Sequence, residues 1–223
     1  MVAAGSGDRL GASVPKALVH AAGRPLVVWS VGSLVASAGV GPVVVVAPPG
    51  YEAAVAAALG SANRVHAVVP GGATRQRSVA AGLAALPDDI DVVLVHDAAR
   101  PLLTPAIVDR ILVALGANDA AIAAVPIPDT LKRAGGGGLV EATVDRSDLW
   151  GAQTPQGFRA DVIRRVFAEA DEAELDSATD CAGMAERRGV PIALVDPGTP
   201  NLKVTTPADL ALVVALLGGA RIA

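Results

Sequence analysis

The segment VVLVHDAARP, residues 92–101, decides the fold class. Its first four residues are apolar and mostly β-branched, which is typical of a short strand that is buried on both faces. Helical patterns of apolar residues precede it near Thr74–Leu86 and follow it near Pro105–Leu115. A strand between two helices predicts right-handed crossover connections and an α/β protein with a mostly parallel sheet.

The same alternation runs along the chain. Strands are predicted at Val43–Ala47, Val65–Val69, Asp91–His96, Ala120–Pro126 and Pro191–Val195. Helices are predicted near Arg24–Ser37, Tyr51–Leu59, Thr74–Leu86, Pro105–Leu115 and Asp180–Gly189. Thr104-Pro105 and Thr206-Pro207 each place a capping hydroxyl before a proline, so a helix is expected to begin at both. Only two residues precede a glycine-rich loop, so the first strand is expected to be very short or truncated in this numbering.

Composition limits the class of protein. A length of 223 residues fits one domain, predicted to span 1–223, and 52% hydrophobic with 2% aromatic residues predicts a core of small side chains. A net charge of −4 argues against a nucleic-acid groove, whereas an anionic substrate needs only a few local cations. The single cysteine, Cys181, allows no internal disulfide, so a cytoplasmic protein is expected. The uncharged stretch from 25 to 51 is broken by serine, glycine and proline, and therefore reads as helix, turn and strand rather than as a membrane span.

The alternation of strand and helix patterns is interrupted between Lys132 and Thr154. A run of glycines, Gly135 to Gly138, is flanked by short alternating segments. This pattern predicts a β-arm with a flexible tip at about residues 132–154, projecting from the core. A disordered surface loop is the alternative that the composition allows equally.

The segment AAGSGDRL, residues 3–10, is a candidate phosphate loop. Glycines let backbone N–H groups approach phosphate oxygens, and Arg9 and Lys16 add two cations suited to a triphosphate that loses pyrophosphate. The spacing is neither that of a P-loop nor that of a dinucleotide fingerprint. The alternatives are a purely structural turn and solvated surface cations.

Asp97 directly follows the apolar run 92–95, at the sheet edge where ligands bind in such folds. A carboxylate there can hold Mg²⁺ together with substrate phosphates. Taken alone, the motif favours a simpler role in which Asp97 caps the next turn. Arg100 is expected to bind a substrate phosphate or to pair with Asp97, and His96 is expected to be structural.

The segment GGATRQRSV, residues 71–79, is a candidate nucleobase site. Its glycine pair allows close backbone contact with a flat base, and Ser78 offers a hydroxyl, while Thr74 is expected to cap the helix. Three smaller segments, at 129–132, 153–156 and 201–205, each place a hydroxyl or a lysine at an element end. Each of them alone would be read as a turn.

Taken in order, these motifs resemble the 2-C-methyl-D-erythritol 4-phosphate cytidylyltransferase family of the non-mevalonate isoprenoid pathway. The resemblance rests on AAGSGDRL with Lys16, GGATRQRSV, VLVHDAARP, DTLKR, TVDR followed by QTPQGF, and NLKVTTPADL, and it runs from Val2 to Leu210. It implies a Rossmann-like three-layer nucleotidyltransferase fold and a homodimer with exchanged arms. It also implies transfer of CMP from CTP to 2-C-methyl-D-erythritol 4-phosphate, with Mg²⁺ or another divalent cation.

The resemblance further implies a role for individual residues. The nucleotide would lie against Ala3, Ala4, Gly5, Gly7, Gly72 and Ser78, and the catalytic cations would be Arg9, Lys16 and Lys203. The substrate side would comprise Asp97, Arg100, Thr130, Arg146 and Thr154, with Asp97 also the metal ligand and the two arm residues serving the partner subunit. Ala73 departs from the acidic residue that is common in the family, which puts base selectivity in question.

Two alternatives follow from the residues. One is a cytidylyltransferase for ribitol 5-phosphate or another sugar or polyol phosphate, because proteins with a related fold bind similar acceptors. The other is a non-catalytic nucleotide-binding module. The presence of Lys16, Asp97 and Lys203 favours an enzyme over the module.

Overall fold

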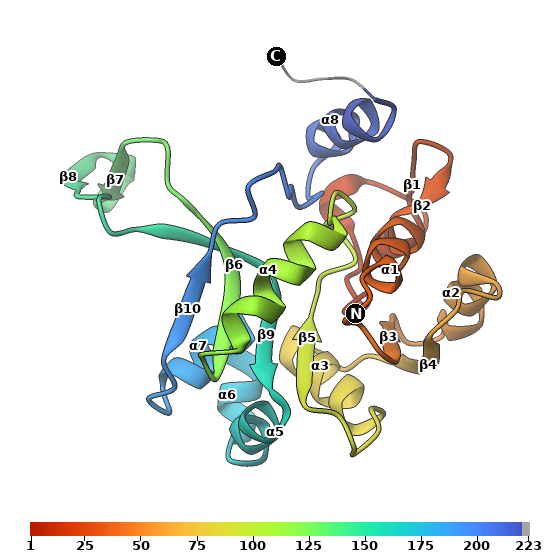
Figure 1. Cartoon of the computed structure of the whole chain (residues 1–223). Helices are drawn as coiled ribbons and strands as arrows, with labels where there is room; N and C mark the ends of the chain where they lie inside the picture. The colour runs from red at the N-terminus through yellow and green to blue at the C-terminus, as the bar shows by residue number, and fades with distance from the viewer. Residues whose placement is uncertain (220–223) are drawn as a thin grey trace.

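Strands and helices alternate along most of the chain (Figure 1). The computed structural model describes residues 1–219. The strands are β1 His20–Ala21, β2 Arg24–Pro25, β3 Val43–Ala47, β4 Val65–Pro70, β5 Val92–Val95, β6 Ala120–Pro126, β7 Leu131–Ala134, β8 Val140–Val144, β9 Trp150–Arg159 and β10 Ile192–Val195. The helices are α1 Leu26–Ala36, α2 Glu52–Leu59, α3 Arg75–Ala84, α4 Pro105–Leu115, α5 Ala160–Ala168, α6 Glu172–Ser177, α7 Cys181–Glu186 and α8 Pro207–Leu217.

The central strands form two groups. β3 and β4 pair in parallel, and the second group has the order β10-β6-β9-β5. β10 runs parallel to β6, whereas β9 runs antiparallel to both β5 and β6. The two groups meet at the start of the chain, where Val2 forms parallel bridges to Val46 and to Asp97. The α/β class is confirmed, and the sheet is mixed because β9 returns between two parallel neighbours.

β9 includes residues 153–156, for which the sequence pattern alone predicts a turn. Residues 154–158 of this strand are buried, and Phe158 is fully enclosed. Gln156 lies opposite Val95 of β5 and Phe158 lies opposite Ala120 of β6. A strand with neighbours on both edges can include proline, glycine and polar residues, because tertiary pairing compensates for a weak local preference.

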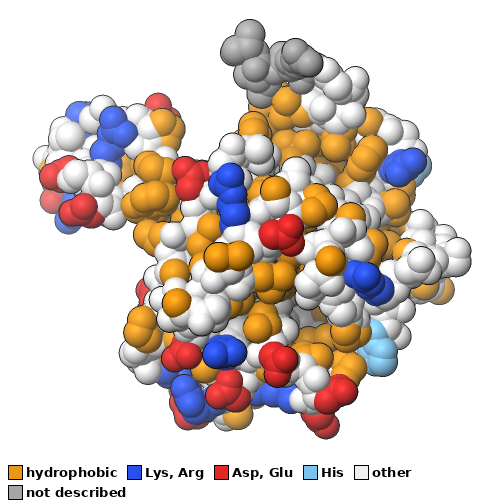
Figure 2. All heavy atoms as spheres, in the orientation of Figure 1, with side chains coloured by type: hydrophobic (Ala, Val, Ile, Leu, Met, Phe, Trp, Pro, Cys, Tyr) orange, Lys and Arg blue, Asp and Glu red, His pale blue; other side chains and the backbone are white. Residues whose placement is uncertain are grey.

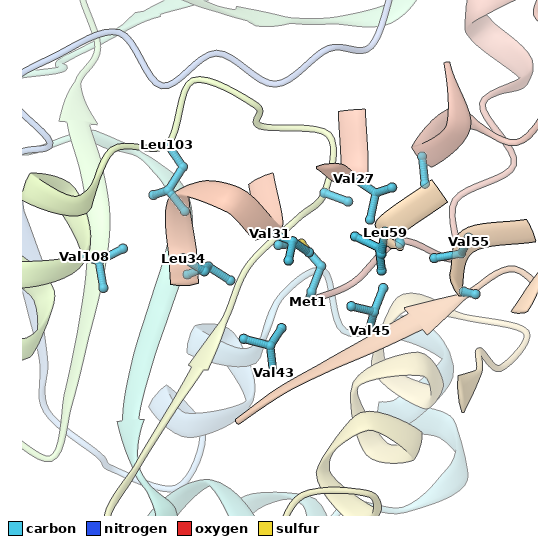
Figure 3. Packing of buried hydrophobic residues seen from close by; sticks show 14 of the residues in the cluster. Met1, Val27, Val31, Leu34, Val43, Val45, Val55, Leu59, Leu103 and Val108 are labelled. Carbon is cyan, nitrogen blue, oxygen red and sulfur yellow. The ribbon is translucent and has the colours of Figure 1, made fainter. Parts of the chain in front are cut away.

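Helices cover both faces of the strands. On one face α1, α2 and α4 pack over a cluster that includes Val27, Val31, Val45 and Val55 (Figure 3). On the other face α3, α5 and α7 pack over a cluster that includes Phe158. This three-layer arrangement leaves the ends of the strands open for a ligand site.

The helix-start signals are confirmed. Thr104 and Thr206 each cap a helix with the side-chain oxygen, accepting from Ile107 N and Asp209 N respectively. The predicted span of α4 matches the observed one, and α1, α2, α3 and α7 are shorter by one to three residues at their ends. α5 and α6 were not predicted. α5 could have been, because Val162, Ile163 and Val166 form one buried stripe.

The predicted arm is a hairpin of β7 and β8 whose tip is the glycine run, and it projects from the body as a separate lobe (Figures 1 and 2). Leu139 and Val140 near the tip are 74% and 64% exposed. The expected arm extended to residue 154, but β9 begins at Trp150 and joins the central sheet. Within residues 1–219 no helix has both the length and the apolarity needed to cross a membrane.

Candidate active site

The predicted nucleotide loops meet at one pocket of about 530 Å³, beside the carboxyl ends of β4 and β5. Its lining contains most of the residues singled out from the sequence: Ala3, Ala4, Gly5, Gly7, Arg9, Lys16, Gly72, Ser78, Asp97 and Lys203. Parallel strands place their following loops at the same edge, so segments far apart in the sequence converge there.

The first loop is anchored at its start and turns sharply. Ala3 N donates to Val46 O at 2.8 Å, and Ala98 N donates to Val2 O at 2.9 Å. Gly7 then takes a left-handed conformation with φ of 82°, and a Cβ there would lie 2.8 Å from Lys16 Cβ. Glycine is therefore required both for the turn and for bringing the loop against Lys16.

The second loop is held from within by Ser78. Its hydroxyl accepts from Gly72 N at 3.1 Å and donates to Thr74 O at 3.0 Å, and the side chain is 1% exposed. A Cβ at Gly72 would lie 2.4 Å from Arg77 Cβ, so a larger residue would displace the loop. Thr74 caps α3 as predicted. The Ser78 hydroxyl therefore shapes the backbone of the loop.

Asp97 lies between two cations. Its Oδ1 accepts from Arg75 at 3.0 Å and its Oδ2 accepts from Lys203 at 2.7 Å. Burial alone would raise the pKa of this carboxyl, but the charges of Arg75 and Lys203 outweigh it and hold the pKa well below its usual range. The carboxylate does not cap the following turn, so the simpler interpretation of Asp97 was wrong.

Arg75 lines the pocket and pairs with Asp97, a role that the sequence motifs did not predict. A signal was available. Arg75 and Ser78 are three residues apart at the start of α3, so both side chains lie on one side of the helix. The expectation that Arg100 could pair with Asp97 was wrong, because Arg75 occupies that position.

Lys16 and Arg9 bring further positive charge to the pocket. Lys16 is half-buried, and burial lowers the pKa of its ammonium. The charges of Lys203 and Arg9 lower this pKa further. Four cationic residues, Lys16, Arg9, Arg75 and Lys203, therefore line a pocket to which Asp97 contributes one well-buried carboxylate. The positive electrostatic potential of these residues favours a polyanionic ligand.

A buried relay fixes the backbone at Asp97. Asp97 N donates to Thr154 Oγ1 at 3.1 Å, and this oxygen is 3.0 Å from His96 Nδ1. His96 Nε2 is 3.3 Å from Arg100 O, which can only accept, so the proton resides on Nε2 and the Thr154 hydroxyl donates to Nδ1. Burial lowers the pKa of His96 to about 3, which keeps the ring neutral at pH 7. The structural role expected for His96 agrees with this geometry.

Four predicted substrate residues do not line the pocket. Thr154 and Arg100 are buried, and Arg100 donates to Asn201 O at 2.6 Å, two residues before Lys203. Thr130 and Arg146 are exposed near and on the arm, where Arg146 donates to Ile127 O. In residues 1–219 no group of three or more His, Cys, Asp and Glu side chains converges as a ready metal site.

Comparison with known proteins agrees with this geometry. The family model of 2-C-methyl-D-erythritol 4-phosphate cytidylyltransferase (IspD) matches residues 1–219. The chain belongs to this family. A cytidylyltransferase of this description from Parasynechococcus marenigrum is 43% identical over 217 residues, covering 97% of this chain and 96% of the relative. One from Frankia casuarinae is 47% identical, covering 96% of this chain and 79% of the relative.

Solved structures of the family have the same fold. The enzyme from Thermus thermophilus superposes with a TM-score of 0.79 at 34% identity, covering 96% of each chain. A 4-diphosphocytidyl-2C-methyl-D-erythritol synthase from Anaerococcus prevotii superposes with a TM-score of 0.83 at 26% identity, covering 97% of this chain and 95% of the other. The chain is therefore a nucleotidyltransferase of the isoprenoid-pathway family, and enzymes of this family generally use a divalent cation.

Proposed function

We propose that this pocket transfers CMP from CTP to 2-C-methyl-D-erythritol 4-phosphate and releases pyrophosphate. The observation that carries the proposal is the convergence of two glycine-containing loops with Lys16, Arg9 and Lys203 around one pocket, in a chain of this family. The acceptor's phosphate oxygen attacks the α-phosphorus of CTP while the bond to pyrophosphate breaks. Because the nucleophile is already an anion, positioning and cations suffice and no strong general base is required.

The nucleotide half of the site is assigned to the two loops. The base and sugar would lie against the backbone of Ala3, Ala4, Gly5 and Gly72, and Gly7 turns the loop toward the phosphates. Ser78 contributes indirectly, because its hydroxyl accepts a hydrogen bond from Gly72 N and so positions the backbone of that residue. Residues of both loops line the pocket, and close contact of a base with their backbone would favour a flat pyrimidine over a larger purine.

The phosphate half is assigned to the cations. Lys16 and Arg9 lie beside the first loop, and Lys203 approaches from the far side of Asp97. The lowered pKa of Lys16 reports burial and repulsion between these cations. A bound triphosphate relieves that repulsion, and the charge that develops on the leaving pyrophosphate meets groups that are already in place.

We propose Mg²⁺ as the divalent cation, with Asp97 as its protein ligand. The donor set fits this ion, because Mg²⁺ in such sites is often held by one carboxylate together with substrate phosphates. The Asp97 oxygens are paired with Arg75 and Lys203, and Oδ2, which accepts from Lys203, keeps a further lone pair that could bind the ion. When bound, Mg²⁺ would neutralise charge on the triphosphate.

The buried substrate-side residues are assigned positioning roles. Arg100 holds the carbonyl of Asn201 and so places the segment that carries Lys203. Thr154 holds the backbone N–H of Asp97. Both residues thereby set the geometry around the carboxylate, which is where the acceptor phosphate and the metal would meet.

We further propose a homodimer with exchanged arms, working in the cytoplasm, in which 1–223 is one domain. Thr130 and Arg146 lie outside the pocket of their own chain, and Leu139, Val140, Leu149 and Trp150 leave apolar surface on and beside the arm (Figure 2). An isolated two-stranded hairpin is only marginally stable in water. Docking two arms about a two-fold axis would cover this surface and bring Arg146 to the neighbouring site.

Nucleotide recognition is tested by thermal shift with CTP and ATP. CTP should raise the Tm of the wild-type protein more than ATP does, and Lys16→Ala should reduce the CTP shift. Equal shifts with CTP and ATP would contradict the assignment of the base site.

The shared site is tested by complementation. Arg146→Ala and Lys16→Ala chains, each nearly inactive alone, are mixed under conditions of subunit exchange. Heterodimers then carry one site with both defects and one intact site, so activity should recover to about one quarter of wild type. Arg133→Ala, on the same hairpin, is the matched control and should remain active alone. No recovery despite confirmed exchange would mean that the arm serves its own chain.

A further inference from the structure

Two residues of α3 contact the backbone of the loop that is assigned to the nucleobase. On one side the Ser78 hydroxyl accepts from Gly72 N at 3.1 Å. On another side Gly72 packs directly against Arg77, where a Cβ on the glycine would lie 2.4 Å from Arg77 Cβ and 3.1 Å from its carbonyl carbon. Because glycine has no side chain, the two backbone segments can approach this closely. A displacement of Arg77 would therefore displace the backbone at Gly72.

The side chain of Arg77 extends from α3 to two carboxylates of α6. Its Nε donates to Asp176 Oδ1 at 2.7 Å and its Nη2 donates to Asp176 Oδ2 at 3.2 Å, so the guanidinium binds this carboxylate through two parallel hydrogen bonds. Nη2 also pairs with Glu172. Glu172 and Asp176 are four residues apart and therefore lie on the same face of α6. Two carboxylates together thus fix the direction of the Arg77 side chain.

α6 is joined to the first turn of α3 by polar contacts (Figure 1). Every residue of this short helix is at least partly exposed, and Leu175 is the residue of α6 that packs against the cluster containing Phe158. Thr74, which caps α3, also donates from its hydroxyl to Leu175 O at 2.7 Å. The contacts of Thr74 and Arg77 therefore hold α6 and the start of α3 in one arrangement.

The other side of α6 is joined to the residues that follow α7. Glu174 accepts from Arg188 Nη2 at 2.8 Å and from Arg187 Nη1 at 3.4 Å. Because an α-helix turns by about 100° per residue, Glu174 points away from the face that carries Glu172 and Asp176. Glu174 therefore supports α6 from the side of α7, whereas the other two carboxylates support it from the side of α3.

We propose that Arg77 is a positioning residue for the nucleobase, which acts through Gly72 and is held in place by Glu172 and Asp176. This role rests on the proposed function, in which the base lies against Gly72. A flat base attracts the loop through atoms at van der Waals distance, and a gap of roughly 0.5–1 Å forfeits about a quarter to a half of that attraction. The ion pairs of Arg77 therefore favour binding of the cytidine part of the nucleotide.

A purely electrostatic role for Arg77 would have different consequences. Arg77 does not itself line the pocket that the described residues form, so its charge would act on the triphosphate only from a distance. Removing that charge would then weaken binding of a polyanion, whereas removing the charges of Glu172 and Asp176 would strengthen it. A positioning role predicts that both changes weaken binding, because both break the same interaction.

The test measures binding of two ligands by titration calorimetry in the presence of Mg²⁺. CTP fills the whole nucleotide site, and inorganic tripolyphosphate fills only the phosphate half. Arg77→Gln removes the charge and keeps much of the stem that packs against Gly72, and a double variant carries Glu172→Gln with Asp176→Asn. A triple variant combines these substitutions. Glu174→Gln is the matched control, because it removes a negative charge from the same helix on the side of α7.

Arg77→Gln and the double variant should each weaken CTP binding about two- to fivefold, the range expected for a well-formed ion pair near the surface. The triple variant should show the same loss rather than the product of the two, because all three substitutions break one interaction. Tripolyphosphate binding should stay within about 1.5-fold of wild type in every variant. Glu174→Gln should bind both ligands as the wild type does, and the Tm of each variant should stay within about 3 °C of wild type.

Several results would overturn the positioning role. Opposite effects of Arg77→Gln and the double variant on CTP affinity, or equal weakening of CTP and tripolyphosphate, would show that charge alone acts. Unchanged CTP affinity in all variants, or equal weakening by Glu174→Gln, would show that the pairing of Arg77 has no specific effect on the base. If the wild type bound no CTP, the proposed function would fail as well, whereas wild-type binding with unaltered variants would contradict only the role of Arg77.

Discussion

The Thr154 hydroxyl holds the backbone of Asp97, and removing it should disturb both stability and catalysis. Thr154→Val keeps the shape of the side chain but leaves the N–H of Asp97 and Nδ1 of His96 without a partner in a site where Thr154 is 4% exposed. Each buried group left unsatisfied costs roughly 1–3 kcal/mol, so the two groups together should lower the free energy of unfolding by about 2–6 kcal/mol. For a chain of this size that loss corresponds to a fall in Tm of roughly 5–25 °C.

The matched control is Thr154→Ser, which keeps the hydroxyl and removes one methyl group. Its Tm should fall by no more than about 3–4 °C, in line with the loss of a single buried methyl. Thermal unfolding measured by circular dichroism and steady-state kinetics at saturating CTP give the two readouts. Turnover should fall about tenfold or more in the valine variant, because Asp97 is no longer fixed, and should stay near wild type in the serine variant. Equal Tm and equal turnover of the two variants would refute the hydrogen-bond relay through the Thr154 hydroxyl.

Four other predictions concern charged or titratable groups. Lys16→Ala should lower turnover by about 10²–10³, the usual effect of losing a preorganised cation, and a change under about threefold in steady-state kinetics would exclude the role. Because the pKa of Lys16 is lowered, its ammonium loses its proton at a lower pH than that of an ordinary lysine. The alkaline fall in wild-type activity should therefore begin at a correspondingly lower pH. Lys16→Arg, which keeps its charge, should move that alkaline fall to higher pH in a pH–rate profile. Asp97→Asn should raise the Mg²⁺ concentration for half-maximal rate, and an unchanged titration would remove Asp97 as a metal ligand. His96, with a pKa near 3 when folded and about 6.5 when unfolded, contributes stability that is complete above pH 6.5 and is lost as pH falls toward 3, by up to roughly 4–5 kcal/mol. Chemical denaturation between pH 7 and pH 4 should show that the free energy of unfolding falls more steeply with decreasing pH in the wild type than in His96→Gln. Parallel curves of this free energy against pH would contradict a buried neutral ring.

Much of the fold could be predicted because local pattern and tertiary role agree. β3 is a run of apolar β-branched residues buried on both faces, and α4 has a capped start and a clear apolar stripe. Their predicted and observed bounds coincide. The convergence of the glycine-containing loops at one pocket could be predicted for a similar reason, since loops that follow parallel strands meet at one edge wherever the strands themselves are recognised.

The remainder depends on contacts between distant segments. β9 contains proline, glycine and glutamine, and it becomes a strand because β5 and β6 pair with its two edges. Arg75 gains its role from Asp97, which is 22 residues away in sequence. Ser78 and Thr154 are predicted to contact ligands, and the structure adds a contact that the sequence does not show, because their hydroxyls bind the backbone N–H groups of Gly72 and Asp97 respectively. A hydroxyl in a motif does not reveal whether it points to a ligand or to the loop that binds the ligand.

The most direct test of the central claim is the formation of a cytidylylated product by the purified protein. CTP, Mg²⁺ and one acceptor are supplied, and both pyrophosphate release and the product's mass are measured. We predict pyrophosphate and 4-diphosphocytidyl-2-C-methyl-D-erythritol in equal amounts with 2-C-methyl-D-erythritol 4-phosphate, and little of either with ribitol 5-phosphate. Equal or faster turnover of ribitol 5-phosphate, or no acceptor-dependent pyrophosphate release, would contradict the account.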